Sequence, residues 1–475
     1  MKIRNHILTS LAALLACASV TGCSLFGKKT DKNALNVICL NLGYGKEWIE
    51  EAVKVWEAEN PDYKVNLNAS PDARSLITSD FAKSNNEDDV YISNGTDWRS
   101  YAGQGKLLEL DSFLEETVDG MKVLDKINPE YHESIYFERP NAGKHTYRLP
   151  WMSDVGGIFY NAKMFQENGW SVPTTADELL ALCQDMIDHP VYVTPGDKTS
   201  PRVYPFAYTG ENTDYFDYLV YTWWGQIVGA DAINEFKKYG KEDSGKFDAN
   251  TNATYAGLKQ ATSKWYSIFG NAAYTDPEDV TRDNHTAQKN FMQGKAAMMV
   301  SGNWLYNEML NYNTNHQLPS NFELKLMSTP QIVSTAESCS YIIGEDQYIA
   351  IPATTKKADL AKSFVKTLIS DRVLKIFFEK AHGMMAYKLS SGNYETDNVY
   401  MKSLMEYRAG LSKTFTIYSS SRLFLNNCVD FWGASSGRPF LQLIKKTYTD
   451  VDDAFAKIYK AVTDSWGDWV SESRM

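Results

Sequence analysis

The chain has 475 residues, 43% of them hydrophobic and 23% charged, with a formal net charge of −11 at pH 7. This length allows about two or three domains with large hydrophobic cores. An acidic chain without a basic cluster beyond residues 28–33 does not suit nucleic acid, so we expect no nucleic-acid partner.

The N-terminus has the pattern of a secretory signal. Lys2 and Arg4 precede an apolar run over residues 7–20, which is too short to span a bilayer. The run ends in Val20-Thr21-Gly22-Cys23, small residues directly before a cysteine, which resembles a bacterial lipobox. We therefore expect cleavage before Cys23, acylation of its sulfur and a short polar tether that holds the protein at a membrane surface. An ordinary signal peptide with a nearby cysteine is the alternative.

Four further cysteines lie far apart in the sequence: Cys39, Cys183, Cys339 and Cys428. No C-x-x-C pair occurs and the seven histidines do not cluster at ligand spacing, so we expect no metal site and no cofactor. In an exported chain these thiols are either buried and free or joined in a disulfide, and the sequence leaves both alternatives open.

The first folded unit is expected to be strand, helix, strand. Residues 37–40 form a short apolar run, residues 46–60 place apolar side chains on one helical face, and residues 65–67 alternate between apolar and polar. This order predicts neighbouring parallel strands. The intervening Gly43-Tyr44-Gly45 lacks the third glycine of a dinucleotide fingerprint because Trp48 takes its place, which argues against a nucleotide ligand.

Two loops that follow strands supply candidate ligand residues. Tyr44 follows the first strand as a candidate wall of a crevice, although a tyrosine in a loop is more often ordinary surface. The strand Asp89–Ser93 leads into Asp97 and Trp98, a carboxylate that can accept two hydroxyl donors and an indole that offers a stacking face. Asp97 can also be the N-cap of a helix that begins at Trp98, and the two roles are compatible.

Residues 290–309 are the most informative stretch of the chain. Ala296–Val300 predicts a short buried strand, Ser301-Gly302-Asn303 predicts a tight turn, and a new helix follows. In an open α/β sheet the carboxyl ends of the strands face the ligand crevice. Trp304 is therefore placed to stack on the C–H face of a neutral ligand with many hydroxyl groups. The alternative is that Trp304 only packs the helix onto the sheet.

Several segments resemble one protein family in their order and spacing. They are Trp56–Val65 (W-E-A-E-N-P-D-Y-K-V), Tyr101–Leu110 (Y-A-G-Q-G-K-L-L-E-L), Arg148–Trp151 (R-L-P-W), Phe159–Phe165 (F-Y-N-A-K-M-F) and Phe291–Trp304. Together they resemble the family 1 extracellular solute-binding proteins of sugar ABC transporters, the group that includes maltose-binding protein. The resemblance extends over essentially the whole mature chain.

This resemblance implies a periplasmic-binding-protein type II-like α/β fold, with two lobes, hinge crossovers and an interlobe cleft that closes on a sugar. The expected divisions are a signal peptide at 1–22, a lipid-anchored tether at 23–35, first-lobe segments at 36–148 and 331–385, and second-lobe segments at 149–330 and 386–475. Where the family often has glycines before a first-lobe strand, this chain has Gly344-Glu345-Asp346-Gln347, which leaves the ligand contacts there open.

The resemblance also places further aromatic and acidic residues in the cleft. The candidates that it adds are Trp151 and Asp154 just past the Pro150 crossover, Tyr215, Tyr218 and Trp223 from the aromatic segment 211–224, and Trp432 from the C-terminal tail. Core packing is the alternative for the aromatic residues, because rings beside a hinge or at helical spacing often pack internally.

The expected function is that of a carbohydrate-binding lipoprotein outside the cytoplasm, anchored to the bacterial cell membrane, which captures a mono- or oligosaccharide and delivers it to an ABC permease. We expect a monomer without enzymatic activity. A secreted glycan hydrolase is the main alternative, with Asp97 and Asp154 imagined as its acid and base, but in the expected fold these carboxylates lie on opposite lobes. A binding module that serves a surface sensor is another alternative.

Overall fold

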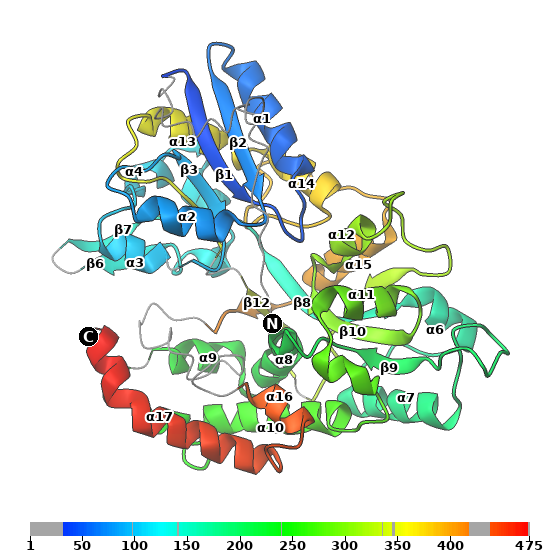
Figure 1. Ribbon diagram of the computed structural model, residues 1–475. Coiled ribbons are helices and arrows are strands. Elements are labelled where there is room, and N and C mark those ends of the chain that lie inside the picture. The colour runs from blue at the N-terminus through cyan, green and yellow to red at the C-terminus, as the bar shows by residue number, and fades with distance from the viewer. Residues whose placement is uncertain are drawn as a thin grey trace, which may run out of the picture.

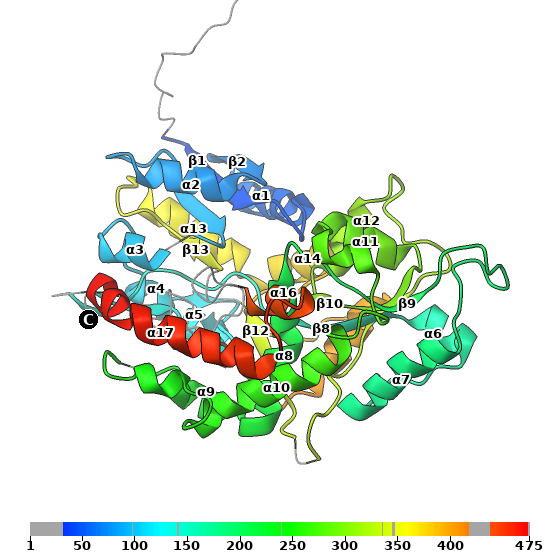
Figure 2. The same ribbon diagram turned by 60° about the horizontal axis from the view of Figure 1, so that its bottom comes forward.

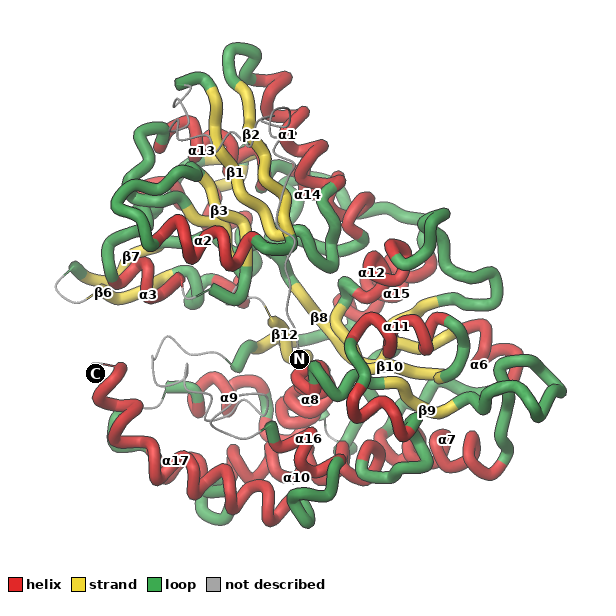
Figure 3. Tube along the Cα trace, in the orientation of Figure 1, coloured by secondary structure: helices red, strands yellow, loops and turns green. Residues whose placement is uncertain are grey.

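The computed structural model describes residues 32–96, 98–139, 142–238, 240–334, 336–343, 347–417 and 438–473 (Figure 1). The chain forms two lobes, each built around a β-sheet with helices against it (Figure 1, Figure 3). This arrangement confirms the predicted two-lobe α/β fold. The predicted signal peptide, the lipidation site Cys23 and most of the tether lie outside the described residues.

The first lobe contains a four-stranded sheet. Its elements are β1 (Ala34–Leu40), α1 (Glu47–Glu59), β2 (Lys64–Ser70), α2 (Ala73–Phe81), β3 (Val90–Ser93), α3 (Trp98–Gly103), α4 (Asp111–Leu114), β4 (Thr117–Val118), β5 (Met121–Lys122), α5 (Val123–Lys126), β6 (Tyr136–Arg139), β7 (Gly143–Thr146), β13 (Tyr348–Ala350), α13 (Ala358–Leu368) and α14 (Asp371–Ala381). The strand order is β13-β3-β1-β2, with β1 parallel to both β2 and β3. The predicted strand-helix-strand unit is therefore confirmed, and its first strand begins earlier because Ala34 and Leu35 extend the apolar run.

The second lobe contains a six-stranded mixed sheet. Its elements are β8 (Asp154–Asn161), α6 (Ala162–Asn168), α7 (Ala176–Asp188), β9 (Tyr204–Ala207), η2 (Thr213–Phe216), α8 (Asp217–Val228), α9 (Ala230–Phe236), α10 (Ala253–Phe269), α11 (Asn284–Met292), β10 (Ala296–Gly302), α12 (Leu305–Asn311), β11 (Leu324–Leu326), β12 (Cys339–Ile343), α15 (Val399–Ala409), β14 (Lys413–Phe415), α16 (Pro439–Ile444) and α17 (Val451–Ser473). The strand order is β14-β12-β8-β10-β9, with β11 also on β8.

Strand β10 is an inner strand of this sheet, between β8 and β9, and all seven of its residues are buried. Met298 and Val300 enter one hydrophobic core, whereas Met299 enters another. Both faces of the strand are therefore covered, which is why its sequence is a continuous apolar run instead of an alternating one. Helices α8 and α10 contact each other below the sheet, and α17 runs along α10 on the outside of the lobe (Figure 2).

Chain segments that cross between the lobes run side by side. Leu149 exchanges two backbone hydrogen bonds with Ile349, of 2.9 and 2.8 Å, in an antiparallel bridge. The backbone N–H of Ala386 donates to the carbonyl oxygen of Trp151 at 3.1 Å. The segments near residues 150, 348 and 385 therefore support one another at the junction of the lobes.

Strand β12 changes one expected lobe boundary. The sequence assigned residues 331–385 to the first lobe, whereas β12 pairs with β8 and β14 and so belongs to the second sheet. The apolar run of β12 favours a strand, but its partner strands lie far away in the sequence, so nothing local tells which sheet it joins. The other lobe boundaries stay predictions.

The described cysteines are buried free thiols. Cys39, Cys183 and Cys339 form no disulfide, and burial raises the pKa of each thiol, that of Cys339 to about 12. Cys428 lies outside the described residues. Within the described ranges, no helix combines the length and the apolar character needed to cross a membrane.

A pair of glycines makes room for aromatic rings beside the second sheet. Gly156 on β8 faces Gly302 on β10 in the antiparallel register. A Cβ at Gly156 would lie 2.3 Å from the Tyr218 ring, and a Cβ at Gly302 would lie 2.4 Å from the Trp304 ring. Side chains at these positions would displace the rings, so the two glycines fix where both aromatic residues stand.

Gly156→Ala should destabilise the fold by about 1–3 kcal/mol, because the new methyl group overlaps the Tyr218 ring and the Ser301 carbonyl oxygen. The matched control is Gly467→Ala on an exposed turn of α17, where nothing lies within 4 Å of the new Cβ and alanine favours the helix. Urea denaturation of both variants measures the difference. Equal midpoints would show that the sheet accommodates the methyl group without cost.

Candidate functional site

A cavity of about 620 Å³, open to solvent, lies where the two lobes meet. Its walls come from the loops after β1 and β3, from the crossover segments, and from η2, α8, α11 and α12 of the second lobe. Carboxylates reach it from Asp154, Asp214, Asp217 and Glu308. This wall therefore combines acceptor groups with aromatic rings, which suits a ligand rich in hydroxyl groups.

Trp304 stands between β10 and α12 and forms part of the cavity wall. Its half-buried ring has its centroid 5.9 Å from that of Tyr215 and 6.0 Å from that of Tyr218. The strand, turn and helix predicted for residues 290–309 are confirmed, with the strand extending to Gly302. Because Gly302 and the two tyrosines hold the indole, its orientation at the cavity is fixed by the fold.

The carboxylate of Asp154 joins three parts of the molecule beside the cavity. Asp154 is fully buried at the start of β8, and its Oδ1 accepts a hydrogen bond from the hydroxyl group of Tyr44 in the loop after β1. Its Oδ2 accepts a hydrogen bond from Nε2 of Gln347, just before β13. Burial and the charge of Asp154 raise the pKa of Tyr44, which therefore stays protonated as a donor.

Gly43 brings the first-lobe loop into direct contact with the second lobe. Its carbonyl oxygen accepts a hydrogen bond of 2.9 Å from Nδ2 of Asn307 on α12. A Cβ on Gly43 would lie 2.8 Å from Cβ of Trp304. Gly43 belongs to the incomplete nucleotide-binding motif in the sequence. In the structure, its lack of a side chain allows the two lobes to approach each other closely.

The structure gathers several of the candidate ligand residues around one cavity. Tyr44, Trp151, Asp154, Tyr215 and Trp304 all line it, although they come from both lobes and from the crossover between them. Their role as ligand contacts stays a proposal, which their common location supports.

Other candidates lie elsewhere. Trp98 is buried in the first-lobe core with its ring centroid 6.2 Å from that of Phe137, and Trp223 donates its indole N–H to the carbonyl oxygen of Pro330 at 2.8 Å. Tyr218 is fully buried behind Trp304. Core packing, which the sequence left open for Tyr218 and Trp223 but did not consider for Trp98, is where the structure places all three rings. Asp97 and Trp432 lie outside the described residues.

Several polar residues of the cavity wall were not among the candidates predicted from the sequence. Asn94 directly follows β3 and Asn284 begins α11, so a search of all strand and helix ends would have found both. Arg74 and Glu308 reach the cavity from helices, and no local pattern marks them. Gln347 lies in the stretch where the chain departs from the family pattern.

Glu308 is an acid whose surroundings disfavour its charge. It lies half-buried on α12 in the cavity wall, and its Oε2 accepts a hydrogen bond of 2.6 Å from Nε2 of Gln288. Burial raises the pKa of Glu308 to about 7, although the bond from Gln288 lowers it. Near neutral pH the group is therefore partly protonated and can donate as well as accept.

Glu308→Gln should be more stable than the parent protein near pH 8 by about 1–2 kcal/mol, and the difference should fade toward about pH 4. The reason is that the pKa of about 7 in the folded protein lies above that of an unfolded glutamate. Ionisation therefore costs stability as the pH rises through the interval between the two values. Urea unfolding across this range, with exposed Glu242→Gln as the control, measures the effect. A difference independent of pH would assign it to packing.

Glu109, Asp111 and His145 form a separate cluster, whose ligating atoms lie within 4.8 Å of one another. The Nδ1 of His145 is 2.7 Å from an Asp111 carboxylate oxygen, and its Nε2 is 2.7 Å from the carbonyl oxygen of Ala142. The contact with Asp111 raises the pKa of His145. Both ring nitrogens face oxygen acceptors, an arrangement that favours the protonated ring paired with Asp111.

Two α/β lobes around a cavity of aromatic and acidic residues define a two-lobe binding protein. Residues 42–375 match the family model for the bacterial extracellular solute-binding proteins, and the chain belongs to this family. The resemblance in the sequence is thereby confirmed.

Two relatives and one solved structure are similar to this chain. The diacetylchitobiose binding protein NgcE of Streptomyces coelicolor is 29% identical over 145 residues, and this chain spans only 30% of its length. The multiple sugar-binding protein of Streptococcus mutans is 21% identical over 72% of either chain. The structure of RafE in complex with raffinose has a TM-score of 0.65 and 16% identity, covering 90% of this chain and 99% of RafE. The likeness to RafE establishes the fold.

Proposed function

We propose that this protein captures a sugar or oligosaccharide in the cavity between its lobes. The observation that carries the proposal is the indole of Trp304, which stands half-buried in the cavity wall at the end of β10. Such a ring takes the C–H face of a pyranose, while the carboxylates and amides around it bind the hydroxyl groups. The names of the relatives, which record diacetylchitobiose, multiple sugars and raffinose, support the same class of ligand.

Binding is coupled to the arrangement of the lobes. Tyr44 of the first lobe and Trp304 of the second lobe both line the cavity. A ligand that contacts the two residues therefore favours the arrangement of the lobes in which each residue reaches the ligand. The paired crossovers near Leu149 and Ile349 form the hinge about which the lobes move. Ligand therefore stabilises the closed state by the contacts that only this state completes.

The receptor delivers its ligand to the permease of an ABC importer and is held at the outer face of the cell membrane by acyl chains on Cys23. Membership of the extracellular solute-binding family supports delivery to a transporter. The small residues before Cys23 support the anchor. The protein acts as a monomer, and a surface sensor in place of the permease is the second candidate for its partner.

The protein binds its sugar without cleaving it. Both carboxylate oxygens of Asp154 accept hydrogen bonds, from Tyr44 and from Gln347, which suits a structural and binding role for this acid. The relatives are binding proteins, which supports the same view.

Trp304→Ala should weaken sugar binding by about 2 kcal/mol or more, roughly thirtyfold, because the stacking surface is lost. The matched control is Trp170→Ala, since Trp170 is also half-buried but packs against Phe165 away from the cavity. Titration calorimetry of the soluble form, beginning after Cys23, measures both variants against raffinose, diacetylchitobiose and other oligosaccharides.

Product analysis of each titrated mixture completes this experiment. Saturable binding with the sugar recovered intact, and lost in Trp304→Ala alone, is the expected result. Cleaved sugar would contradict the proposed receptor function and would favour a glycan hydrolase. Normal binding by Trp304→Ala would make the ring a packing element, and the absence of heat with every glycan would remove carbohydrate as the ligand.

Cys23→Ser should move the protein from the membrane fraction to the soluble fraction of expressing bacteria, because a serine hydroxyl group does not replace the acylated sulfur. Cys17→Ser is the control, since Cys17 lies within the expected signal peptide. Cell fractionation and immunoblotting measure the distribution. A parent protein that is itself in the soluble fraction would favour the alternative of an ordinary signal peptide, and retention of Cys23→Ser on the membrane would show that the anchor does not depend on Cys23.

A further inference from the structure

The buried polar atoms of the cavity wall include two on almost fully buried side chains that have no hydrogen-bond partner among the described residues. They are the indole Nε1 of Trp151, a donor, and the amide Oε1 of Gln347, an acceptor. Each residue is only 2% exposed. A buried donor or acceptor left without a partner destabilises a fold, so a fold that retains this pair at one cavity suggests that a ligand supplies the partners.

Asp154 fixes the orientation of the Gln347 amide. Nε2 of Gln347 donates to Oδ2 of Asp154, a carboxylate oxygen that can only accept. Turning the amide over would place two acceptors against each other, so Nε2 stays at Asp154 and Oε1 stays on the other side. The backbone is held as well, because the Arg148 guanidinium donates to the carbonyl oxygen of Gln347 at 2.7 Å.

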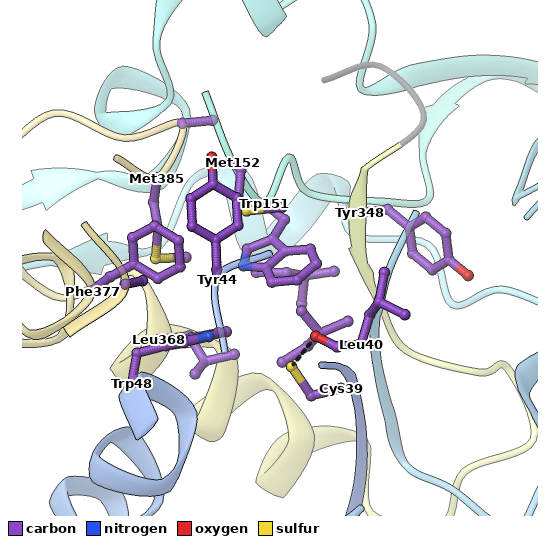
Figure 4. Packing of buried hydrophobic residues seen from close by; sticks show 14 of the residues in the cluster. Cys39, Leu40, Tyr44, Trp48, Trp151, Met152, Tyr348, Leu368, Phe377 and Met385 are labelled. Atoms are coloured by element: carbon purple, nitrogen blue, oxygen red, sulfur yellow. Dashed lines mark hydrogen bonds between the residues drawn. The ribbon is translucent and has the colours of Figure 1, made fainter. Parts of the chain in front are cut away.

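Trp151 is held just as firmly, across the crossover from Gln347. Trp151 lies two residues after Leu149 and Gln347 lies two residues before Ile349, on the two segments that the antiparallel Leu149–Ile349 bridge joins. The Trp151 ring packs on that of Trp48, with centroids 5.9 Å apart, in the cluster shown in Figure 4. A donor and an acceptor thus stand in fixed positions on neighbouring crossover segments.

We propose that Trp151 and Gln347 form a subsite that selects a ligand hydroxyl group over groups that only accept hydrogen bonds. The hydroxyl group donates its proton to Oε1 of Gln347, and its oxygen accepts the N–H of Trp151. No ionised or acceptor-only substituent satisfies both atoms. The subsite rests on the proposed function, the binding of a carbohydrate. Within that function, Gln347 on the crossover segment is the residue that selects the hydroxyl group.

Deoxyfluoro sugars test the subsite directly, since fluorine accepts weakly and has no proton to give. For a glycan that binds in the calorimetric panel, such as raffinose or diacetylchitobiose, each hydroxyl group is replaced in turn by fluorine. Replacement at one position should weaken binding to the parent protein about tenfold or more. In Gln347→Leu, which lacks the acceptor, the hydroxyl and fluoro forms at that position should bind alike.

The tryptophans provide a matched pair of variants. Trp265 on α10 and Trp151 are both buried with an unpartnered indole N–H in the described structure, but of the two only Trp151 lines the cavity. Phenylalanine removes the N–H and a similar volume in each. Trp151→Phe should weaken binding about tenfold, whereas Trp265→Phe should bind as the parent does. Thermal unfolding of the ligand-free variants shows whether both fold.

The outcomes separate the subsite from the proposed function. Equal affinities of folded Trp151→Phe and Trp265→Phe would overturn the subsite, as would a parent protein that binds every deoxyfluoro form as tightly as the glycan itself. In either case, weak sugar binding by Trp304→Ala would still support the proposed function of a sugar receptor. If no glycan binds, the proposed function and the subsite fall together.

Discussion

One buried carboxylate, that of Asp154, holds together the parts of the molecule on which the cavity depends. It begins the central crossover strand β8 and accepts hydrogen bonds from Tyr44 of the first lobe and from Gln347 of the returning crossover. A buried charge whose partner is removed costs several kcal/mol, so each of these contacts fixes the others. The position of the tyrosine, the direction of the glutamine amide and the start of the strand therefore follow from a single acid.

Several groups around the cavity destabilise the protein in the absence of a ligand. The unpartnered atoms of Trp151 and Gln347 cost hydrogen-bond energy, and the ionisation of Glu308 is opposed by burial. A filled cavity would relieve the first of these costs directly. The same residues are rigid, packed against rings and paired crossovers, so a ligand meets groups that are already oriented. Lower stability in the free state and selectivity for a ligand thus have one structural origin.

Local patterns predicted much of the fold and only part of the cavity. The strand and turn before Trp304 were predictable because turn residues bound a short apolar run. The rings of α8 were not, since Tyr218 and Trp223 both lie on a helix buried on all sides, where periodicity cannot single out the face toward a ligand. Gln347 and strand β12 depend on partners far away in the sequence, and no window of residues contains that information.

The first lobe is assembled from two distant pieces of chain. Strand β13 completes its sheet, and α13 and α14 pack on α1, so the lobe closes only after residue 381 has been made. At about 5–20 residues per second, the ribosome needs on the order of 10–50 s to travel from the start of β8 to that point. During this interval the N-terminal strands lack their edge strand and their covering helices. An export signal at the N-terminus would therefore act on a chain whose first lobe has not yet folded.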